Sequence, residues 1–532
     1  MRVLFFMRHH GYVRNFESTL DRLAARGHEV HLAFDQPVEG AYGRPTLACL
    51  HDLAERHQGL TYGFAPNSPP DAPEVFARRV RSALDWLRYF EPALAGATKA
   101  RARVAKRAPV LVRRVVSRSS GCRPAGRRAL VRVLRALERE TPLRRDDLDF
   151  LTRLKPDLVL VTPLVDGGAQ TGYVRAARRL GIRSGLCVSS WDNLTSKGLI
   201  HEIPDLVTMW NALQRREAIE LHGVPDGRIA VTGAQSFDQW FRFAASTSRD
   251  EFCAACGLDP ERPFLLYMCS SGFISGDEAD HVERWIAWLR ARPERELREV
   301  GVLVRPHPVN AGVWRGRDLA HHGQAALWRL EDTEPATQPA KEEYFDSVHH
   351  ASAVLGLNST SLVESAAIGR PVLTLLTPEY AASQEGTAHF GVIAGEDGML
   401  IVARTMEQHA AQLLAALRDP DLDGERRRRF VEGFVRPHGL DVEATGVLVT
   451  EIERAAAAPP PLPARPSLGS TAIRAALAPV VRIPTGKEWA RTQKRVRRRV
   501  RRVRRRVRRR RHALAHGVAA LADRVAHGLS RS

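Results

Sequence analysis

Short apolar runs alternate with helix-period segments along most of this chain, and this alternation limits the folds open to it. Residues 2–6, 158–162, 265–268 and 302–304 are such runs, and each leads into a polar turn. Strands that alternate with helices predict parallel sheets wrapped by helices, which is the α/β class. Because 532 residues exceed one ordinary domain, we predict two, at residues 1–245 and 246–457.

The most informative motif is NSTSLVESAAIGRP, at residues 358–371. An apolar run ends there in an amide and three hydroxyl residues: Asn358, Ser359, Thr360 and Ser361. A helical pattern then opens, with Glu364 expected in its first turn. Backbone N–H groups and the dipole at such a helix start attract phosphate oxygens, and the carboxylate could accept hydrogen bonds from a ribose. The alternative is a serine-capped helix without a ligand.

Two other strand ends offer groups that suit a phosphate. Residues 302–304 lead into Arg305-Pro306-His307-Pro308, where the prolines stop the strand and keep the intervening residues extended. Residues 265–268 lead into a turn that contains Ser270 and Ser271. Ligands of open α/β sheets bind outside the carboxyl ends of the strands. Three such ends therefore predict a nucleotide-diphosphate site.

These motifs resemble the C-terminal half of glycosyltransferases of the GT-B type. The most similar groups are the CDP-glycerol glycerophosphotransferases, the capsule-polymer transferases and, more distantly, the non-hydrolysing UDP-N-acetylglucosamine 2-epimerases. The shared pattern is a His-Pro element, a Ser/Gly-rich turn, a helix with glutamate, and Gly-x-Pro-Val; here these are His307-Pro308, residues 359–361, Glu364 and residues 369–372. Ser-Thr-Ser stands where the epimerases tend to have Ser-Gly-Gly, and its side chains fill space that glycine leaves open.

The resemblance implies two Rossmann-like domains that face a cleft, with a UDP-, CDP- or GDP-linked donor in the second. By it, His307 and the hydroxyl turn hold the diphosphate and Glu364 the ribose. Gln384 and Glu385 would grip the donor's sugar from the loop 377–390. In several such families a histidine after the first strand is the general base, which indicates His10, with His9 beside it. GT-B enzymes generally stabilise the leaving diphosphate with protein groups, so we expect no metal and no cofactor.

A polar loop at residues 189–198 has the composition of an acceptor site. Trp191 offers a stacking face, Asp192 and Asn193 offer hydrogen bonds, and Lys197 offers a charge for phosphate. The alternative is a half-buried tryptophan that only anchors the loop. Asp166, in the preceding loop, is a further catalytic candidate. A 2-epimerase would need carboxylates near the sugar, and only Asp166, Asp192 and Glu385 are candidates.

The net charge of +20 is concentrated at the end of the chain. Residues 481–532 contain nineteen Lys/Arg against two Asp/Glu. We predict a Pro-rich linker at 458–485 and an Arg-rich amphipathic helical tail at 486–532, with apolar residues at heptad spacing. An anionic membrane surface is its first candidate partner, nucleic acid the second and a coiled-coil dimer the third. A basic insertion at about 95–140, interleaved with valine and leucine, favours the membrane; the alternative is a solvated helical cover for the sheet.

These features together predict a cytoplasmic transferase, peripherally associated with the inner face of the plasma membrane. It would move a glycosyl or glycerophosphoryl group from a nucleotide-activated donor to a hydroxyl of a polysaccharide or lipid-linked acceptor. Two alternatives remain open. One is a nucleotide-sugar 2-epimerase, and the other is a protein that binds nucleic acid through its tail and keeps a vestigial GT-B body.

Overall fold

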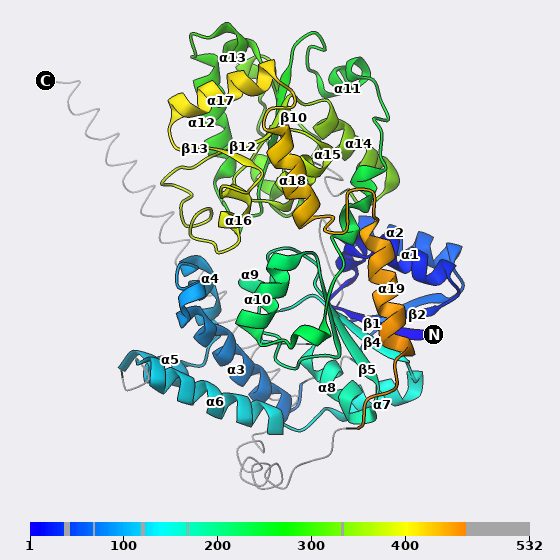
Figure 1. The fold of residues 1–532 in the computed structure, drawn as a ribbon. Coiled ribbons are helices and arrows are strands. Elements are labelled where there is room, and N and C mark those ends of the chain that lie inside the picture. The colour runs from blue at the N-terminus through cyan, green and yellow to red at the C-terminus, as the bar shows by residue number, and fades with distance from the viewer. Residues whose placement is uncertain are drawn as a thin grey trace, which may run out of the picture.

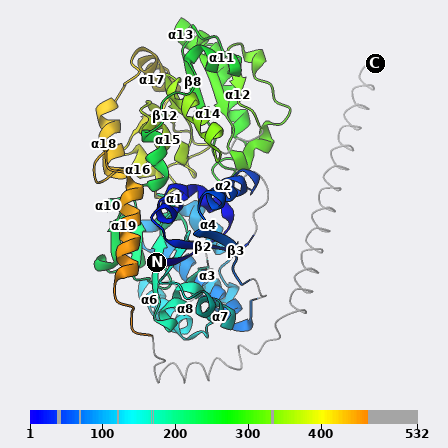
Figure 2. The same ribbon diagram turned by 90° about the vertical axis from the view of Figure 1, so that its right-hand side faces the viewer.

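The computed structural model describes residues 1–36, 43–66, 70–118, 123–165, 167–168, 170–330 and 335–463. These residues form two parallel β-sheets with interleaved helices, stacked one above the other in Figures 1 and 2. The predicted α/β class with two Rossmann-like sheets is confirmed.

The N-terminal sheet has seven strands in the order β3-β2-β1-β4-β5-β6-β7, all parallel. The strands are β1 (Arg2–Met7), β2 (Glu29–Phe34), β3 (Leu60–Phe64), β4 (Leu158–Thr162), β5 (Arg183–Cys187), β6 (Leu206–Met209) and β7 (Ile229–Val231). Its helices include α1 (Glu17–Ala25), α2 (Gly43–Arg56), α3 (Ala72–Leu87), α7 (Arg145–Leu154), α8 (Thr171–Leu180), α9 (Asn193–Ser196) and α10 (Ala212–His222).

The C-terminal sheet has six parallel strands in the order β10-β9-β8-β11-β12-β13. They are β8 (Phe264–Met268), β9 (Gly301–Arg305), β10 (Ala325–Leu327), β11 (Ala353–Leu355), β12 (Val372–Leu375) and β13 (Leu400–Ala403). The helices are α11 (Arg249–Cys256), α12 (Glu278–Arg290), α13 (Arg295–Glu299), α14 (Gln338–His349), α15 (Thr360–Ile368), α16 (Phe390–Ala394), α17 (Met406–Arg418) and α18 (Gly424–Phe434).

Both sheets are buried on both faces, which explains why their strands are continuous apolar runs. Leu4 and Phe6 of β1 pack in one hydrophobic core, while Val3 and Phe5 pack in another. Successive side chains of a strand point to opposite faces, so each face of the sheet has its own core. In both sheets the strand order reverses beside the first strand, and ligands of such folds bind at this switch point.

Helix α19 (Ala444–Ala457) returns from the C-terminal domain to the N-terminal one. It falls within the range predicted for the second domain, yet Leu448, Val449 and Ile452 lie in the core beneath β1. In Figure 1 it runs beside the N-terminal sheet. An apolar face of this kind must be buried somewhere, and here it is buried on the first domain. The chain therefore crosses between the domains twice.

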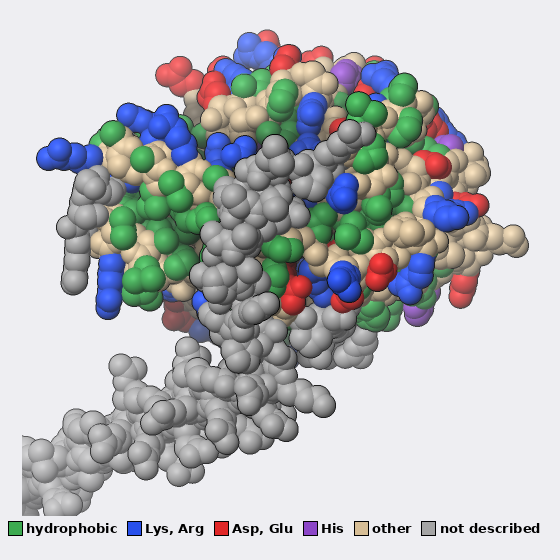
Figure 3. All heavy atoms as spheres, turned by 90° about the horizontal axis from the view of Figure 1, so that it is seen from below, with side chains coloured by type: hydrophobic (Ala, Val, Ile, Leu, Met, Phe, Trp, Pro, Cys, Tyr) green, Lys and Arg blue, Asp and Glu red, His purple; other side chains and the backbone are tan. Residues whose placement is uncertain are grey.

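The predicted basic insertion folds as α4 (Thr98–Ala105), α5 (Val110–Arg118) and α6 (Pro124–Glu140). Val110, Leu111, Val115 and Val133 are 45–73% exposed, and Figure 3 shows apolar and basic side chains gathered at the left of the lower face. The predicted tail and most of the linker (464–532) lie outside the described residues, so membrane association stays a prediction. No described helix is long and apolar enough to cross a membrane.

Candidate functional site

A cleft of about 600 Å³ lies between the two domains. It opens at the carboxyl ends of β8, β9 and β11 and faces the loops after β1 and β5. Of the residues predicted from sequence, eleven line it: Trp191, Asp192, Lys197, Ser271, Arg305, His307, Asn358, Ser359, Thr360, Ser361 and Glu364. Two domains facing a cleft is the arrangement that the resemblance implied.

The N-terminus of α15 forms the floor of the cleft's C-terminal side. Ser359 is the N-cap residue, and its hydroxyl accepts a hydrogen bond from the backbone N–H of Ser361 at 3.3 Å. Gly356 allows the preceding turn to approach β8 closely, because a Cβ there would lie 2.7 Å from the carbonyl oxygen of Met268. The helix start is thereby held against the strand ends, where its N–H groups suit an anion.

Glu364 lies one turn further along α15 than its predicted place. The helix begins at Thr360, so Glu364 is its fifth residue and belongs to the second turn. Its carboxylate accepts a hydrogen bond from the Tyr344 hydroxyl. Burial raises the pKa of Glu364, and the bond from Tyr344 partly offsets this effect. One carboxylate oxygen is thus engaged, and the side chain still lines the cleft.

Arg305, the last residue of β9, lines the cleft although it is only 6% exposed. Its guanidinium stacks on the rings of Trp328 and Tyr344, 4.3 and 5.2 Å from their centroids. It lies 3.4 Å from the Ser347 hydroxyl, and no carboxylate among the described residues forms an ion pair with it. Burial lowers the pKa of Arg305 to about 10, so it remains a cation at neutral pH. A buried cation without a carboxylate suits an anionic ligand.

His307 is a neutral hydrogen-bond donor. Its Nδ1 accepts a bond from the backbone N–H of Val309 at 3.2 Å, so the ring proton lies on Nε2. Burial, assisted by the charge of Arg14, lowers the pKa of His307 to about 4. Because the ring lines the cleft, it offers an N–H group there at neutral pH without adding a charge.

The opposite wall is the loop after β5, which contains α9. Asp192 accepts hydrogen bonds from the hydroxyls of Ser190 and Ser196 and from the amide of Asn193, at 2.6–3.2 Å. Burial opposes its ionisation, yet Lys197, His389 and these donors hold the pKa of Asp192 well below its usual range. Asp192 is therefore a fixed anion. Asn193 is buried, and its amide serves this network.

Trp191 connects the two walls. It is 5% exposed, its indole N–H donates to Thr360 Oγ1 at 3.2 Å, and its ring meets the His389 ring edge-on at 4.9 Å. The alternative foreseen from sequence, an anchoring tryptophan, describes this packing better than a free stacking face. Since Thr360 and His389 belong to the C-terminal domain, Trp191 anchors one domain on the other.

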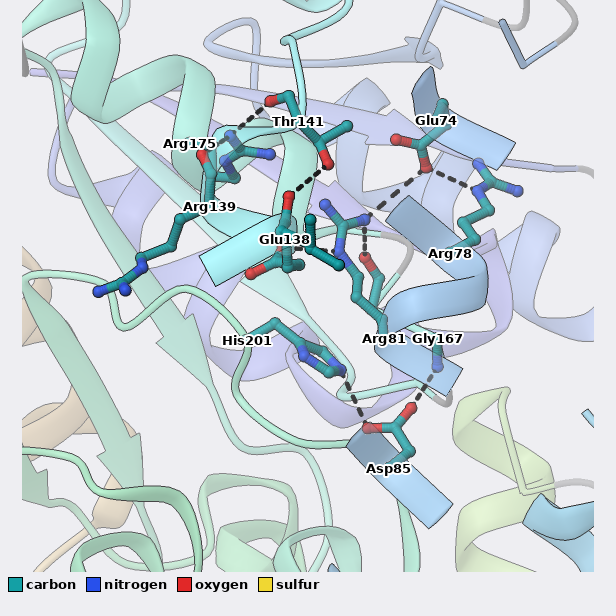
Figure 4. A network of polar contacts seen from close by, with 12 residues as sticks. Glu74, Arg78, Arg81, Asp85, Glu138, Arg139, Thr141, Gly167, Arg175 and His201 are labelled. Carbon is teal, nitrogen blue, oxygen red and sulfur yellow. Dashed lines mark hydrogen bonds and ion pairs between the residues drawn. The ribbon is translucent and has the colours of Figure 1, made fainter. Parts of the chain in front are cut away.

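Helix α3 supports this wall from behind. Arg88, at the end of α3, donates to the carbonyls of Leu194, Thr195 and Lys197 at 2.6–3.2 Å. Asp85, one turn earlier, accepts from the backbone N–H of Leu199 at 2.7 Å and bonds His201 at 2.9 Å; Figure 4 shows its contacts with His201 and Gly167. The loop that contains Asp192 and Lys197 is therefore held on a rigid helix.

His222 on α10 completes this support, and it should make stability depend on pH. Its Nδ1 accepts from the N–H of Ile200, while Nε2 lies 2.8 Å from the Leu194 carbonyl and 3.4 Å from Arg88. Nε2 therefore carries the proton of the neutral ring, and the lone pair of Nδ1 is occupied by Ile200, so the ring has no free site for a second proton. Burial, with the charge of Arg88, lowers the pKa of His222 to about 3.

We expect the free energy of unfolding of His222→Gln to fall less at acid pH than that of the wild type. The folded-state pKa lies below the unfolded value of about 6.5, so the unfolded chain binds more protons and stability falls as pH drops below 6.5. Between pH 6.5 and pH 5 the wild type should lose about 1.6 kcal/mol relative to the variant. Urea unfolding at both pH values measures this difference; parallel pH profiles would contradict it.

The structure places both histidines of the first loop away from the cleft lining. His10 is 8% exposed; its Nδ1 lies 3.2 Å from the Thr46 hydroxyl of α2, and its ring meets Phe34. His9 packs on the Tyr12 ring, and burial lowers its pKa to about 4. The 3₁₀-helix η1 (His10–Asn15) turns these two inward, so that its later residues, Tyr12, Arg14 and Asn15, line the cleft instead.

Gln384 and Glu385 also lie outside the cleft, which corrects the predicted sugar grip. Gln384 is fully buried and donates to Thr374 Oγ1 and to the Leu375 carbonyl. Glu385 is exposed and forms an ion pair with Arg404 at 3.1 Å. Consecutive turns between Tyr380 and Thr387 fold the loop back on β12. The residue of this loop that lines the cleft is His389.

Of the two remaining predicted residues, the structure describes one. Ser270 is fully buried, and its backbone N–H donates to Glu278, so only Ser271 of that pair lines the cleft. Asp166 lies outside the described residues. The described residues contain no group of three or more His, Cys, Asp or Glu that could hold a metal ion.

Several cleft residues had no signal in the sequence. Arg14, Arg103, Lys341, Tyr344 and His389 all line it. Arg14 lies near enough to lower the pKa of both His307 and Glu364, so it reaches the donor side from the N-terminal domain. Only its position, four residues after His10 in the loop of the first strand, could have indicated it.

Comparisons with known proteins find similarity only at the level of fold. No family model and no curated protein matches the sequence. Similar solved structures include UDP-GlcNAc 2-epimerase from Methanocaldococcus jannaschii, with 11% identity and a TM-score of 0.46, covering 85% of this chain and 99% of that one. A glycosyltransferase from Rickettsia africae has 8% identity and a TM-score of 0.46, with 86% and 99% covered. CalG4, the calicheamicin glycosyltransferase, has 14% identity and a TM-score of 0.41, and the match covers 85% of this chain and 98% of that one.

Proposed function

We propose that this protein is a transferase that takes a glycosyl or glycerophosphoryl group from a nucleoside-diphosphate donor and passes it to a hydroxyl acceptor. One observation carries the proposal. A buried arginine that pairs with no described carboxylate, a neutral histidine donor and a helix N-terminus converge on one interdomain cleft: Arg305, His307 and the start of α15. Together they supply charge-assisted and neutral donors for the oxygens of a diphosphate.

The donor's nucleotide would lie on the C-terminal wall. Arg305, His307 and Arg14 would bind the diphosphate, and Glu364 would accept from the ribose with the oxygen that Tyr344 leaves available. In glycosyl transfer, the acceptor oxygen bonds to the donor's anomeric carbon as the bond from that carbon to the diphosphate oxygen breaks, and the nucleoside diphosphate leaves with the electron pair. In glycerophosphoryl transfer, the acceptor oxygen bonds to the phosphorus that carries the glycerol, the bond from that phosphorus to the bridging oxygen breaks, and the nucleoside monophosphate leaves with the electron pair. In either case these donors stabilise the developing charge. One donor of this kind is typically worth about 2.7–4 kcal/mol of barrier.

His389, rather than His10, is the group we assign to accept the acceptor's proton. It lines the cleft beside Trp191, and burial lowers its pKa, so the imidazole is neutral at physiological pH. The carboxylate of Asp192 acts in the opposite direction on that pKa, and it would stabilise the imidazolium formed in the step. Asp192 itself is a poor proton acceptor because its hydrogen bonds favour the ionised form.

The cleft supports transfer better than 2-epimerisation. Proton abstraction from a sugar carbon needs carboxylates close to that carbon, and the carboxylates among the described lining residues are Asp192 and Glu364. Asp192 accepts from two hydroxyls and an amide, and Glu364 accepts from Tyr344 and is assigned to the ribose, which lies away from the reacting sugar carbon. The epimerase and the nucleic-acid-binding protein remain the alternative proposals.

Thermal unfolding with UDP, CDP, GDP and dTDP and their sugar-linked forms tests the proposal. We expect the nucleotides of one base to stabilise the protein by about 2.7 kcal/mol when their concentration is a hundred times their Kd. If none of the nucleotides changes the unfolding temperature, the proposed nucleotide site is contradicted. NMR of the stabilising nucleotide sugar, incubated with the protein but without acceptor, then distinguishes epimerisation from transfer. An epimerase would invert the configuration at C2 of the sugar, and a transferase would not. His389→Asn should bind the same nucleotide and lose turnover.

A further inference from the structure

Trp191 belongs to the N-terminal domain, but it lies in a hydrophobic core formed mainly by the C-terminal one. It is 5% exposed, in a cluster that includes Leu362 and Val363 of α15. Its ring also meets Phe434 of α18 edge-on, with the centroids 6.1 Å apart. In Figure 1, α9, which begins two residues after Trp191, lies at the domain boundary below α16. The loop that forms the acceptor wall is therefore seated in the domain that would bind the donor.

The indole N–H of Trp191 donates to the helix that is proposed to bind the diphosphate. Its acceptor is Thr360 Oγ1, at 3.2 Å, and Thr360 is the first residue of α15. A hydroxyl accepts with its lone pairs and donates a single proton. Because the indole takes one lone pair, the rotation of the hydroxyl is restricted. The Thr360 proton is left for an acceptor in the cleft, which this residue lines, and a phosphate oxygen is such an acceptor.

The other contacts of Trp191 lead to the residues assigned to the acceptor. Its ring lies edge-on to the imidazole of His389, with the centroids 4.9 Å apart. The next residue along the chain is Asp192, and its charge acts on the pKa of His389. The backbone carbonyl of Asp192 accepts from the N–H of Ser196 at 2.8 Å, as part of α9. A displacement of the indole would therefore disturb both the proposed base and the acceptor wall.

We propose that Trp191 is a positioning residue that transmits the presence of the donor's diphosphate to the acceptor wall through the Thr360 hydroxyl. The proposal rests on the proposed function, because it concerns the regulation of the same cleft. A diphosphate that accepts from Thr360 fixes and polarises this hydroxyl, which makes it a better acceptor for the indole. Donor binding then holds Trp191, and with it His389 and α9, in the arrangement that the structure shows. By linkage, the indole strengthens donor binding to the same extent.

A double-mutant cycle on nucleotide affinity tests this link. UDP, CDP, GDP and dTDP are the probes, and the one that stabilises the protein is titrated by calorimetry. Trp191→Phe keeps an aromatic ring but loses the N–H group, and it should weaken binding roughly 3- to 10-fold, the size of one neutral hydrogen bond. Thr360→Val should weaken binding at least as much, and adding Trp191→Phe to it should cause no further loss. Thr360→Ser, which keeps the hydroxyl, should retain most of the affinity that Thr360→Val loses.

Amide hydrogen exchange in α9 shows whether the effect reaches the acceptor wall. In the wild type, saturating nucleotide should slow exchange at residues 195–197 at least about fivefold, and in Trp191→Phe or Thr360→Val less than about twofold. Trp210→Phe is the matched control, because Trp210 is 1% exposed in the same core and its indole N–H has no partner among the described residues. This variant should keep the slowing. If Trp191→Phe does not fold, Thr360→Val compared with Thr360→Ser measures the same link.

Two results would overturn the proposal: losses of affinity that multiply in the double variant, which indicate packing alone, or slowing of α9 exchange that persists in Trp191→Phe and Thr360→Val. Failure of the proposed function gives a different result. If no nucleotide changes the unfolding temperature, inorganic diphosphate is the probe. Slowing of exchange by inorganic diphosphate that both variants lose then supports the link from an anion at α15 to the wall, although no nucleotide binds. No slowing with inorganic diphosphate would overturn both proposals.

Discussion

Arg305→Ala is expected to weaken nucleoside-diphosphate binding by roughly 10- to 150-fold, which corresponds to the 1.5–3 kcal/mol of a hydrogen bond to a charged group. The protein should stay folded, because the arginine forms no ion pair with any described carboxylate and its removal leaves no buried anion behind. Arg305→Lys should recover only part of the affinity, since an ammonium keeps the charge but cannot donate in the fork geometry of a guanidinium.

Arg329→Ala is the matched control for Arg305→Ala. Arg329 stacks on the same indole, Trp328, at 5.4 Å from the ring centroid, but it is exposed, pairs with Glu343 and does not line the cleft. If both variants lose affinity equally, the effect comes from the packing of Trp328 and Arg305 does not bind the phosphate. Isothermal titration with the stabilising nucleotide measures both affinities.

The fold could be predicted from the sequence because both sheets are buried on two faces. Strands such as β8 and β9 are then unbroken apolar runs, and the polar turn after each marks the sheet edge where ligands bind. The same logic found Arg305, His307 and the hydroxyl turn, since each lies at the end of a strand or within a few residues after it. The position of these residues in the cleft depends only on where each strand ends, and a short stretch of sequence is enough to predict that end.

The residues that were misplaced depend on turns that a local pattern does not determine. His10 lies three residues after the end of β1, but a 3₁₀-helix turns it towards Thr46 and brings Arg14 to the cleft. Gln384 has the polarity of a ligand residue, yet the backbone of β12 uses its amide. A side chain of this type satisfies a buried carbonyl as readily as a sugar hydroxyl, and only the folded loop decides between them.

The contacts of α4 with the C-terminal domain could not be predicted from the sequence either. The composition of the insertion predicts a basic and apolar surface for a membrane, and this stays a prediction. Lys99 and Arg103 of the same insertion also reach Phe273 and Ile274 of the other domain, contacts between residues about 170 positions apart. Such contacts arise from how the domains face one another, which charge and periodicity do not reveal.

Asp85→Ala should have the largest effect on stability, about 3–5 kcal/mol. Asp85 is fully buried and accepts from the N–H groups of Gly167 and Leu199 and from His201, at 2.6–2.9 Å. Alanine would leave all three donors buried without an acceptor. Figure 4 shows Asp85 on the same helix as Arg81, whose buried ion pair with Glu138 links α3 to α6, so the loss should spread to the insertion.

The pH dependence distinguishes a charged Asp85 from a merely packed one. Burial would raise its pKa, but His201 and the two backbone donors hold the pKa below the usual value. A carboxyl whose folded pKa is depressed stabilises the protein above its unfolded pKa of about 3.9, and this contribution is lost as pH falls further. The difference between wild type and Asp85→Ala should therefore persist from pH 8 to pH 5 and shrink below about pH 3.9, whereas the contribution of a merely packed side chain would not change with pH. Asp149→Ala, an exposed aspartate on α7, should change stability by less than about 0.5 kcal/mol.

The same substitution tests whether α3 positions the acceptor wall. Leu199 follows Lys197 by two residues, so the loss of its bond to Asp85 should let the loop around Lys197 move. Nucleotide affinity depends on the other domain, and it should change less than twofold in Asp85→Ala at temperatures where the variant is folded. Amide hydrogen exchange at residues 194–199 should become at least about 10-fold faster, because the backbone N–H of Leu199 has lost its acceptor. If exchange in this loop stays as slow as in the wild type, the wall does not need α3, and the buried carboxylate of Asp85 serves stability alone.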